Sequence, residues 1–221
     1  MIAGTPTMIY VDGFNLYYGA LKGTSYKWLN FEALFMRIFP NNKIVGIRYF
    51  TAPINALPSD PDQPLRQQLL FRALRTLPLV TIIEGHYLCH PKNMPLVNPP
   101  PGANRFALVL FTEEKGSDVN LASYLLVDGF KNAYDCAIVV SGDSDLATPI
   151  IMARQELGKT VGVLLPQRLS NPPQKTRRRS ARLQQVASFF RDGIRTGVLA
   201  SSQFPPTVTD ARGTFSKPAS W

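Results

Sequence analysis

The chain has 221 residues, of which 45% are hydrophobic, and it carries a formal net charge of +9. These values suit one globular domain with a proper core, and no apolar run approaches the length of a membrane span. The start of the chain has no basic stretch followed by an apolar one, so no secretory signal is expected. Its two cysteines, Cys89 and Cys136, lie in apolar stretches, which indicates a reducing, cytoplasmic setting without a disulfide framework.

Stretches with strand character alternate with stretches of helical spacing along most of the chain. The predicted strands are residues 7–12, 44–51, 79–88, 105–112, 137–140 and 160–165. The predicted helices are residues 13–21, 31–39, 65–77, 118–131, 145–157 and 181–191. This alternation predicts an α/β fold with a mostly parallel sheet and right-handed crossovers, while the strand order stays open.

Two segments fall outside this alternation. Residues 90–104 contain five prolines and are expected to be an irregular excursion, after which residues 105–112 pair back on residues 79–88 as an edge hairpin. Residues 196–221 are rich in Ser, Thr, Pro and Gly and have no periodicity. We therefore expect one domain over residues 1–195, followed by a flexible C-terminal tail.

Acidic residues follow the ends of two predicted strands. The run 137–140 is typical of a strand buried on both faces, and Asp143 and Asp145 follow it closely. The first strand likewise ends at Asp12. If these two strands are neighbours, their carboxyl ends form a crevice at the switch point of the sheet, where α/β proteins bind ligands.

A fourth carboxylate, Asp118, lies at the start of a predicted helix, from which it can project into the same crevice. Mg²⁺ and Mn²⁺ take oxygen ligands from one or two carboxylates, and waters and substrate phosphate complete the shell. Two such ions can activate a water and stabilise the leaving oxygen in a displacement at phosphorus. Asp12, Asp118 and Asp145 could instead cap turns or helices, but the joint occurrence of four acids favours a metal site.

Positive charge is concentrated between Lys159 and Arg195, where nine Lys and Arg residues accompany a single acid, Asp192. Such a segment is expected of a protein that binds a polyanion, and a solvated loop that aids solubility is the alternative. We expect nucleic acid, not a membrane, as the partner, with binding that falls steeply as salt is raised. The side chains placed to neutralise backbone phosphates are Lys115, Arg177, Arg178 and Arg179.

Four motifs then point to a known family by their order and spacing. They are Val11-Asp-Gly-Phe-Asn-Leu16, Glu114-Lys-Gly-Ser-Asp-Val-Asn-Leu-Ala122, Tyr134-Asp-Cys-Ala-Ile-Val-Val-Ser-Gly-Asp-Ser-Asp-Leu146 and Gly158-Lys-Thr-Val-Gly-Val163. With these motifs the chain resembles the NYN domains, in particular the bacterial LabA/DUF88 branch of the PIN-like nuclease superfamily. The resemblance implies a PIN-like three-layer α/β/α sandwich with divalent-metal-dependent ribonuclease chemistry.

The resemblance also implies roles for individual residues. The positions that match the metal ligands of the family are Asp12, Asp118 and Asp143, with Asp145 as its auxiliary acid. Asn15 matches the polar residue after the first acid, and Ser141 opens the Ser-Gly-Asp block, so both are expected at the substrate site. The Pro-rich residues 91–101 and the basic residues 175–182 depart from the family pattern, which affects the substrate path and not the metal site.

We therefore expect a metal-dependent endoribonuclease that uses Mg²⁺ or Mn²⁺ to hydrolyse single-stranded or structured RNA. Two alternatives are open: a non-catalytic nucleic-acid-binding or regulatory module, and a nuclease that acts on DNA. A homodimer is also considered. The aromatic residues that could stack on bases are Tyr17, Tyr18, Tyr26 and Trp28, although packing in the core or at its rim is the default expectation. His86 and Cys89 lack the second ligand cluster that zinc sites need and are expected to be ordinary strand residues.

Overall fold

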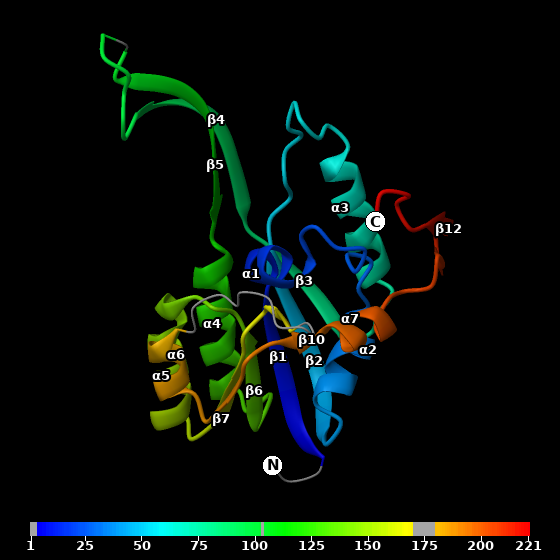
Figure 1. Cartoon of the computed structure of the whole chain (residues 1–221). Helices are drawn as coiled ribbons and strands as arrows, with labels where there is room; N and C mark the ends of the chain where they lie inside the picture. Colours follow the sequence, from blue (N-terminus) through cyan, green and yellow to red (C-terminus); the bar gives the residue numbers. More distant parts are fainter. Residues whose placement is uncertain (1–3, 103, 170–179) are drawn as a thin grey trace.

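The computed structural model describes residues 4–102, 104–169 and 180–221. Parallel strands form a six-stranded central sheet in the order β3–β2–β1–β6–β7–β9 (Figure 1). These strands are β1 (Thr5–Asp12), β2 (Asn42–Thr51), β3 (Val80–Glu84), β6 (Cys136–Val140), β7 (Thr160–Leu164) and β9 (Phe189–Arg191). Helices cover both faces of the sheet, so the predicted three-layer α/β/α sandwich is confirmed.

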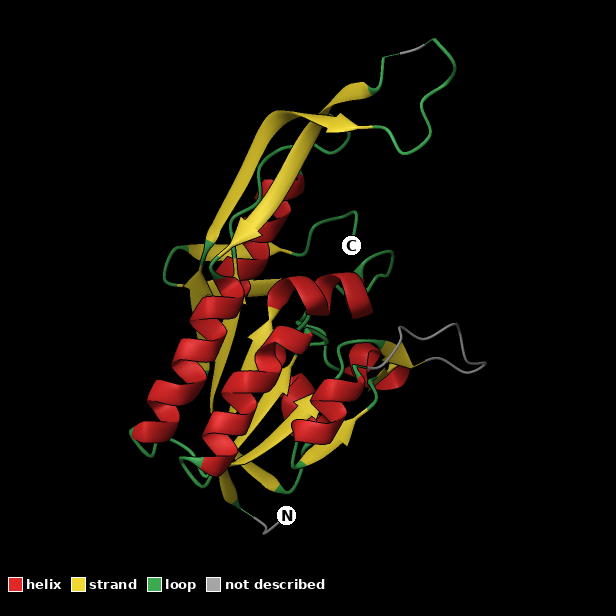
Figure 2. Cartoon of the chain, turned by 90° about the vertical axis from the view of Figure 1, so that its left-hand side faces the viewer, coloured by secondary structure: helices red, strands yellow, loops and turns green. Residues whose placement is uncertain are grey.

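Each face of the sheet has its own helical layer. Alternate residues of β1 divide between the layers, as expected for a strand: Ile9 and Val11 pack in one, and Met8 and Tyr10 in the other. The first layer contains α1 (Gly13–Leu16), α2 (Phe31–Ile38), α3 (Gln63–Leu74) and α7 (Thr196–Ser201). The second contains α4 (Ser117–Phe130), α5 (Ala147–Gln155) and α6 (Ala181–Val186), which lie side by side in Figure 2. Within the described ranges, no helix combines the length and apolar character needed to span a membrane.

Strand β1 lies between β2 and β6, with Asp12 opposite Phe50 and Val11 opposite Val140. The chain continues from β1 to β2 and β3 on one side, and later adds β6, β7 and β9 on the other. The boundary between β1 and β6 is therefore the switch point, where the carboxyl ends of the strands can form a ligand site. The strand neighbours required for the predicted crevice are thus the ones found.

The predicted third strand is divided in two at Gly85. β3 ends at Glu84, and β4 (His86–Pro95) leaves the sheet to pair antiparallel with β5 (Phe106–Lys115). A Cβ atom on Gly85 would lie 2.6 Å from the carbonyl oxygen of Lys115, so a larger residue would push the two strands apart. The β4–β5 hairpin projects from the body of the molecule (Figures 1 and 2).

This hairpin confirms the predicted pairing but corrects two details of it. The hairpin is a separate two-stranded sheet and not an edge of the parallel sheet. The Pro-rich stretch is also regular as far as Pro95, because β4 runs through Pro91 and Pro95 in register with β5. Each strand of a two-stranded ribbon has one free edge, where a residue without an N–H is tolerated.

The C-terminal part of the chain also differs from its predicted structure. The helix predicted over residues 181–191 ends at Val186, and Phe189–Arg191 joins the sheet as β9. The short strands β8 (Arg168–Leu169) and β10 (Ile194–Arg195) pair with each other. Beyond them, α7 leads into a hairpin of β11 (Thr207–Asp210) and β12 (Gly213–Ser216).

Residues 196–221 are therefore not a tail without regular structure. The indole N–H of Trp28 donates to the carbonyl oxygen of Pro205 at 2.9 Å, which ties this segment to the loop before α2. Apart from the short run Val198-Leu199-Ala200, its apolar side chains are isolated among polar residues, and the segment has no sustained helical or strand period that would predict its packing. Those buried in the first layer are Leu199, Phe204, Val208 and Phe215. The domain boundary at residue 195 stays a prediction.

Candidate acidic active site

The carboxylate of Asp12 is fixed in place by burial and by hydrogen bonds to both of its oxygens. It is only 3% exposed and forms the N-cap of α1 at the end of β1. Its Oδ1 accepts the backbone N–H of Asn15 at 2.9 Å, and its Oδ2 accepts the Asn15 Nδ2 at 2.5 Å and the Ser141 hydroxyl at 2.8 Å. Burial raises the pKa of Asp12, and these neutral donors oppose the rise.

The carboxyl end of β6 is joined to Asp12 through the same residues. The Ser141 Oγ also accepts the backbone N–H of Asp143 at 3.1 Å, and the Asn15 Oδ1 accepts that of Gly142 at 3.4 Å. Asp143 in turn caps the 3₁₀ turn Ser144–Leu146 before α5. Local capping and a shared hydrogen-bond network therefore fix the directions of Asp12 and Asp143 together.

Asp118 joins this cluster from the first turn of α4. Although Asp118 is exposed at the surface, desolvation by the atoms packed around its carboxyl raises the pKa of this group to about 6. The negative charges that add to this rise are those of Asp12, Asp143, Glu114 and Asp145. The structure thus brings the four predicted acids into one electrostatic cluster. It adds Glu114, whose side chain also accepts the backbone N–H of Ser117 at 2.9 Å at the start of α4.

The cluster has the chemistry of a hard-cation site. Among the described residues, no Lys or Arg forms an ion pair with any of the four predicted acids. No group of three or more His, Cys, Asp or Glu side chains in that part of the chain is arranged to hold a metal ion as it stands. Mg²⁺ needs only one or two protein carboxylates when waters and phosphate complete its shell, so Asp12 with Asp118 or Asp143 would suffice.

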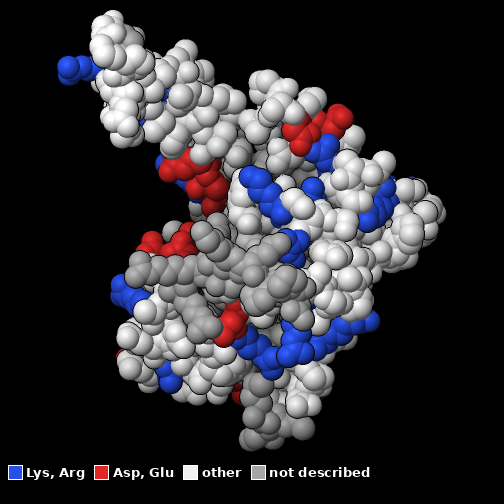
Figure 3. All heavy atoms as spheres, viewed as in Figure 1, with Lys and Arg blue, Asp and Glu red and all other residues white. Residues whose placement is uncertain are grey.

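The residues predicted to bind substrate are not all found at the acidic site. Asn15 and Ser141 do lie at the site, but they hold Asp12 by hydrogen bonds. Lys115 ends β5 beside α4, where its exposed ammonium lies 3.5 Å from the carboxylate of Glu113. Figure 3 shows acidic side chains gathered just below the projecting hairpin. The predicted phosphate contacts Arg177, Arg178 and Arg179 lie outside the described residues.

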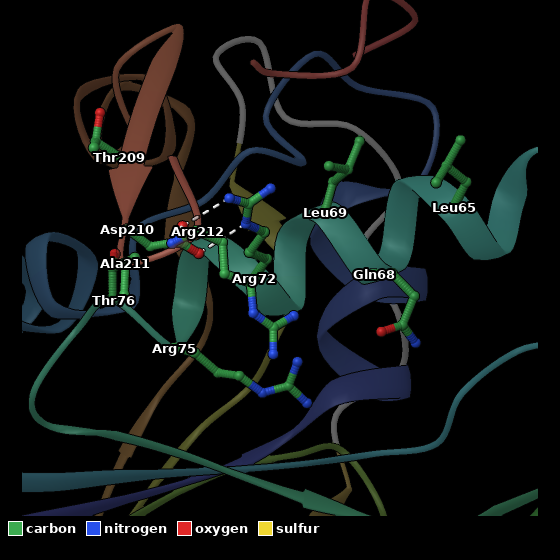
Figure 4. Close-up of a pocket in the computed structure, with 10 residues that line it drawn as sticks. All are labelled: Leu65, Gln68, Leu69, Arg72, Arg75, Thr76, Thr209, Asp210, Ala211 and Arg212. Carbon is green, nitrogen blue, oxygen red and sulfur yellow. Dashed lines mark hydrogen bonds and ion pairs between the residues drawn. The ribbon is translucent and has the colours of Figure 1, made fainter. Parts of the chain in front are cut away.

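A hollow of about 200 Å³ lies between α1, the end of β2 and α3, and the residue after Asp12, Gly13, is part of its lining. The aromatic residues that line it are Phe14, Tyr17, Tyr18, Tyr49, Tyr87 and Trp221. A larger groove of about 680 Å³ lies on the outer side of α3, against the β11–β12 hairpin (Figure 4). None of the four predicted acids lines either space, but the smaller hollow is lined by Gly13 and Phe14, which directly follow Asp12 in the chain, so it is the one that adjoins the candidate site.

Replacing Asp118 with Asn is expected to stabilise the metal-free protein. A raised carboxyl pKa means that ionisation costs stability, and this cost grows between pH 4 and 6 and is constant above pH 6. Because Asp118 is exposed, solvent screens the repulsion, and the expected gain in Tm at pH 7.5 is about 1–2 °C.

Thermal unfolding in EDTA at pH 4 and pH 7.5 would measure this effect. Asp62→Asn, which replaces an exposed acid at the start of another helix, α3, is the matched control and should give no gain. A gain from Asp118→Asn that is equally large at pH 4 would contradict the electrostatic explanation.

Comparisons with known proteins give three results. The NYN domain family matches residues 6–190. The chain is 32% identical over 239 residues to the 6-hydroxy-3-succinoylpyridine 3-monooxygenase HspA of Pseudomonas putida, with 97% of this chain and 75% of that protein covered. A solved structure of a protein of unknown function from Vibrio parahaemolyticus has a TM-score of 0.52 and 15% identity, with 96% of this chain and 97% of that chain covered. At that identity the structural similarity shows the fold alone.

Proposed function

Because this chain belongs to the NYN domain family, we propose that it is a divalent-metal-dependent endoribonuclease that hydrolyses phosphodiester bonds in RNA. The observation that carries the proposal is the cluster of Asp12, Asp118, Asp143 and Asp145. It lacks a cationic partner among the described residues. Placement in the LabA/DUF88 branch of the PIN-like superfamily and assembly as a homodimer stay predictions.

A bound Mg²⁺ or Mn²⁺ would lower the pKa of a coordinated water and neutralise charge on the phosphate. Asp12 would hold the ion with little rearrangement, because Asn15 and Ser141 already fix both of its oxygens. The acidic neighbours of Asp118 disfavour the ionised form of its carboxyl group, and the bound metal ion would give this carboxylate a cationic partner. Lys115 would contact the phosphate backbone on the α4 side of the site.

Cleavage assays on labelled single-stranded RNA and DNA of the same sequence would test this function. Each should be run with Mn²⁺, with Mg²⁺ and with EDTA. We expect cleavage of RNA with either metal and none with EDTA. Preferred cleavage of DNA would make the protein a DNA nuclease, and binding without cleavage in every metal would make it a regulatory module.

A second candidate follows from the relative in Pseudomonas putida, whose name describes a monooxygenase of a succinoyl-substituted hydroxypyridine. The observation that favours it is the aromatic hollow beside Asp12, since its volume suits a single ring and phosphodiester hydrolysis does not require such a hollow. Incubation with 6-hydroxy-3-succinoylpyridine, O₂ and reduced nicotinamide dinucleotide would test it. Consumption of the pyridine together with an absence of RNA cleavage would favour this candidate.

A further inference from the structure

The hollow beside Asp12 is built on the first turn of α1. Gly13 packs so closely on Tyr49 that a Cβ atom would lie 2.7 Å from the Tyr49 ring. The next two residues have different roles: Phe14 lines the hollow, whereas the side chain of Asn15 donates a hydrogen bond to Asp12. The hollow and the acidic cluster are therefore neighbours that share one helical turn.

The walls of the hollow are aromatic and come from separate parts of the chain. Phe14 and Tyr87 lie nearly parallel, with an interplanar angle of 6° and ring centroids 6.0 Å apart, which joins α1 to the base of the β4–β5 hairpin. Tyr17 and Tyr18 pack edge to face at 5.2 Å in the π-helical turn Tyr17–Leu21. Tyr18 is 48% exposed, so a ring that enters from solvent can contact it without displacing the core.

The polar groups of the hollow include a cation that is free to take a ligand. Lys27 is half-buried in its lining, and no carboxylate among the described residues forms an ion pair with it. Arg66 also lines the hollow, but it is paired with Asp60. Amide side chains at the rim are those of Asn55 and Gln63.

The volume of about 200 Å³ suits a single flat ring, since an apolar cavity of about 150 Å³ is large enough to bind benzene. The lining of the hollow combines aromatic rings with polar and charged side chains, and aromatic walls with convergent polar groups are a usual form of a small-ligand site. The larger groove on α3 is a poorer candidate, because none of the described residues that line it is aromatic and two of the three arginines among them, Arg72 and Arg75, are already paired with Asp210 and Glu84.

We propose that this hollow is a subsite for one planar nitrogen heterocycle that carries an anionic group. The ring stacks against Tyr18 and the aromatic wall of the hollow, and the anion is held by Lys27. Two sources supply this chemistry: a nucleotide unit of the RNA of the proposed function, or a free heteroaromatic acid. The inference extends the proposed function to substrate recognition, but ring binding does not itself require a metal or cleavage.

Calorimetric titration of the purified protein would test the subsite with three probes. Uridine 5′-monophosphate represents the nucleotide, nicotinate the free heteroaromatic acid, and cyclohexanecarboxylate an anion of similar size without an aromatic ring. We expect one of the first two to bind and thereby identify the source, and we expect the third not to bind. Equal binding of cyclohexanecarboxylate, or no binding of either ring at millimolar concentration, would overturn the proposal.

Three variants locate the binding. Tyr18→Ala is expected to lower affinity about tenfold or more, as for loss of a stacking residue, and Lys27→Gln about tenfold, as for loss of a charge-assisted hydrogen bond. Arg212→Gln makes the same change of charge in the larger groove (Figure 4) and should leave affinity unchanged. If it weakens binding as much as Lys27→Gln does, the ring binds elsewhere.

Failure of this inference can be told apart from failure of the proposed function. RNA cleavage without any ring binding would overturn the subsite alone. Ring binding in EDTA that Tyr18→Ala weakens, combined with no cleavage in any metal, would overturn the nuclease proposal and leave the subsite standing.

Discussion

Asp12→Asn is expected to reduce RNA cleavage by at least about a hundredfold. Replacing a residue that only hydrogen-bonds to a metal ligand costs up to about a hundredfold, and loss of a ligand itself should cost at least as much. The substitution removes a negative charge that is 3% exposed and interacts with the charges of Asp118 and Asp143. An Asn amide can still accept the backbone N–H of Asn15, so the cap of α1 and the fold are expected to persist. Initial rates of cleavage with saturating Mn²⁺, together with circular dichroism, would measure both effects.

The matched control is Asp135→Asn. Asp135 immediately precedes β6, at the amino end of the strand whose carboxyl end carries the site, and it is exposed. Its loss should leave the rate within about twofold of that of the unchanged protein, because surface substitutions remote from special features have small effects. Equal loss of activity in both variants would point to general misfolding. Undiminished cleavage by Asp12→Asn would show either that Asp12 is not part of the site or that the activity comes from a contaminating nuclease.

Asp128→Ala is expected to lower stability by about 3 kcal/mol, at the low end of the cost of breaking a buried ion pair. Asp128 joins α4 to the sheet: its carboxylate accepts two hydrogen bonds from Arg48, at 2.6 and 2.8 Å, and one from the Tyr10 hydroxyl at 2.8 Å. Without it, the guanidinium and the buried hydroxyl are left unpaired. For a chain of this size the expected fall in Tm is about 6–12 °C.

Asp210→Ala provides the comparison for this prediction. Asp210 also accepts two hydrogen bonds from an arginine, Arg72, both at 2.7 Å, but the pair lies at the surface of the C-terminal hairpin. Its loss should lower Tm much less, because water solvates the groups left behind. Thermal unfolding of both variants in EDTA would decide the matter, and an equal effect of the two would show that burial of Asp128 is unimportant.

The acidic residues at the strand ends could be predicted from sequence because their signals are local. Asp12 caps α1 through a residue three positions away, and Asp143 caps its turn through a residue two positions away. The same locality left their function open, since a cap and a metal ligand have the same sequence pattern. The structure shows that both residues are caps and that both also belong to the acidic cluster.

Other features depend on contacts between distant segments. The aromatic hollow combines residues from α1, the end of β2, α3, the base of the β4–β5 hairpin and the C-terminal end of the chain. No single sequence motif therefore predicts it. The sequence marks Tyr17 and Tyr18 as stacking candidates, but Tyr87, which stacks on Phe14 in the same lining, lies in a strand that the sequence pattern placed in the main sheet. The division of that strand depends on the close approach of Gly85 to Lys115, some thirty residues later.

The sequence by itself determined the α/β class, the parallel character of the sheet and the acids that follow its strands. These depend on the period of apolar residues and on caps within a few positions. Only the tertiary structure decided that β1 lies beside β6, that Asp118 reaches Asp12, and that residues 196–221 complete the first helical layer. The physical reason is that strand order and the packing of isolated apolar side chains depend on the surface buried between segments far apart in sequence, which no local pattern contains.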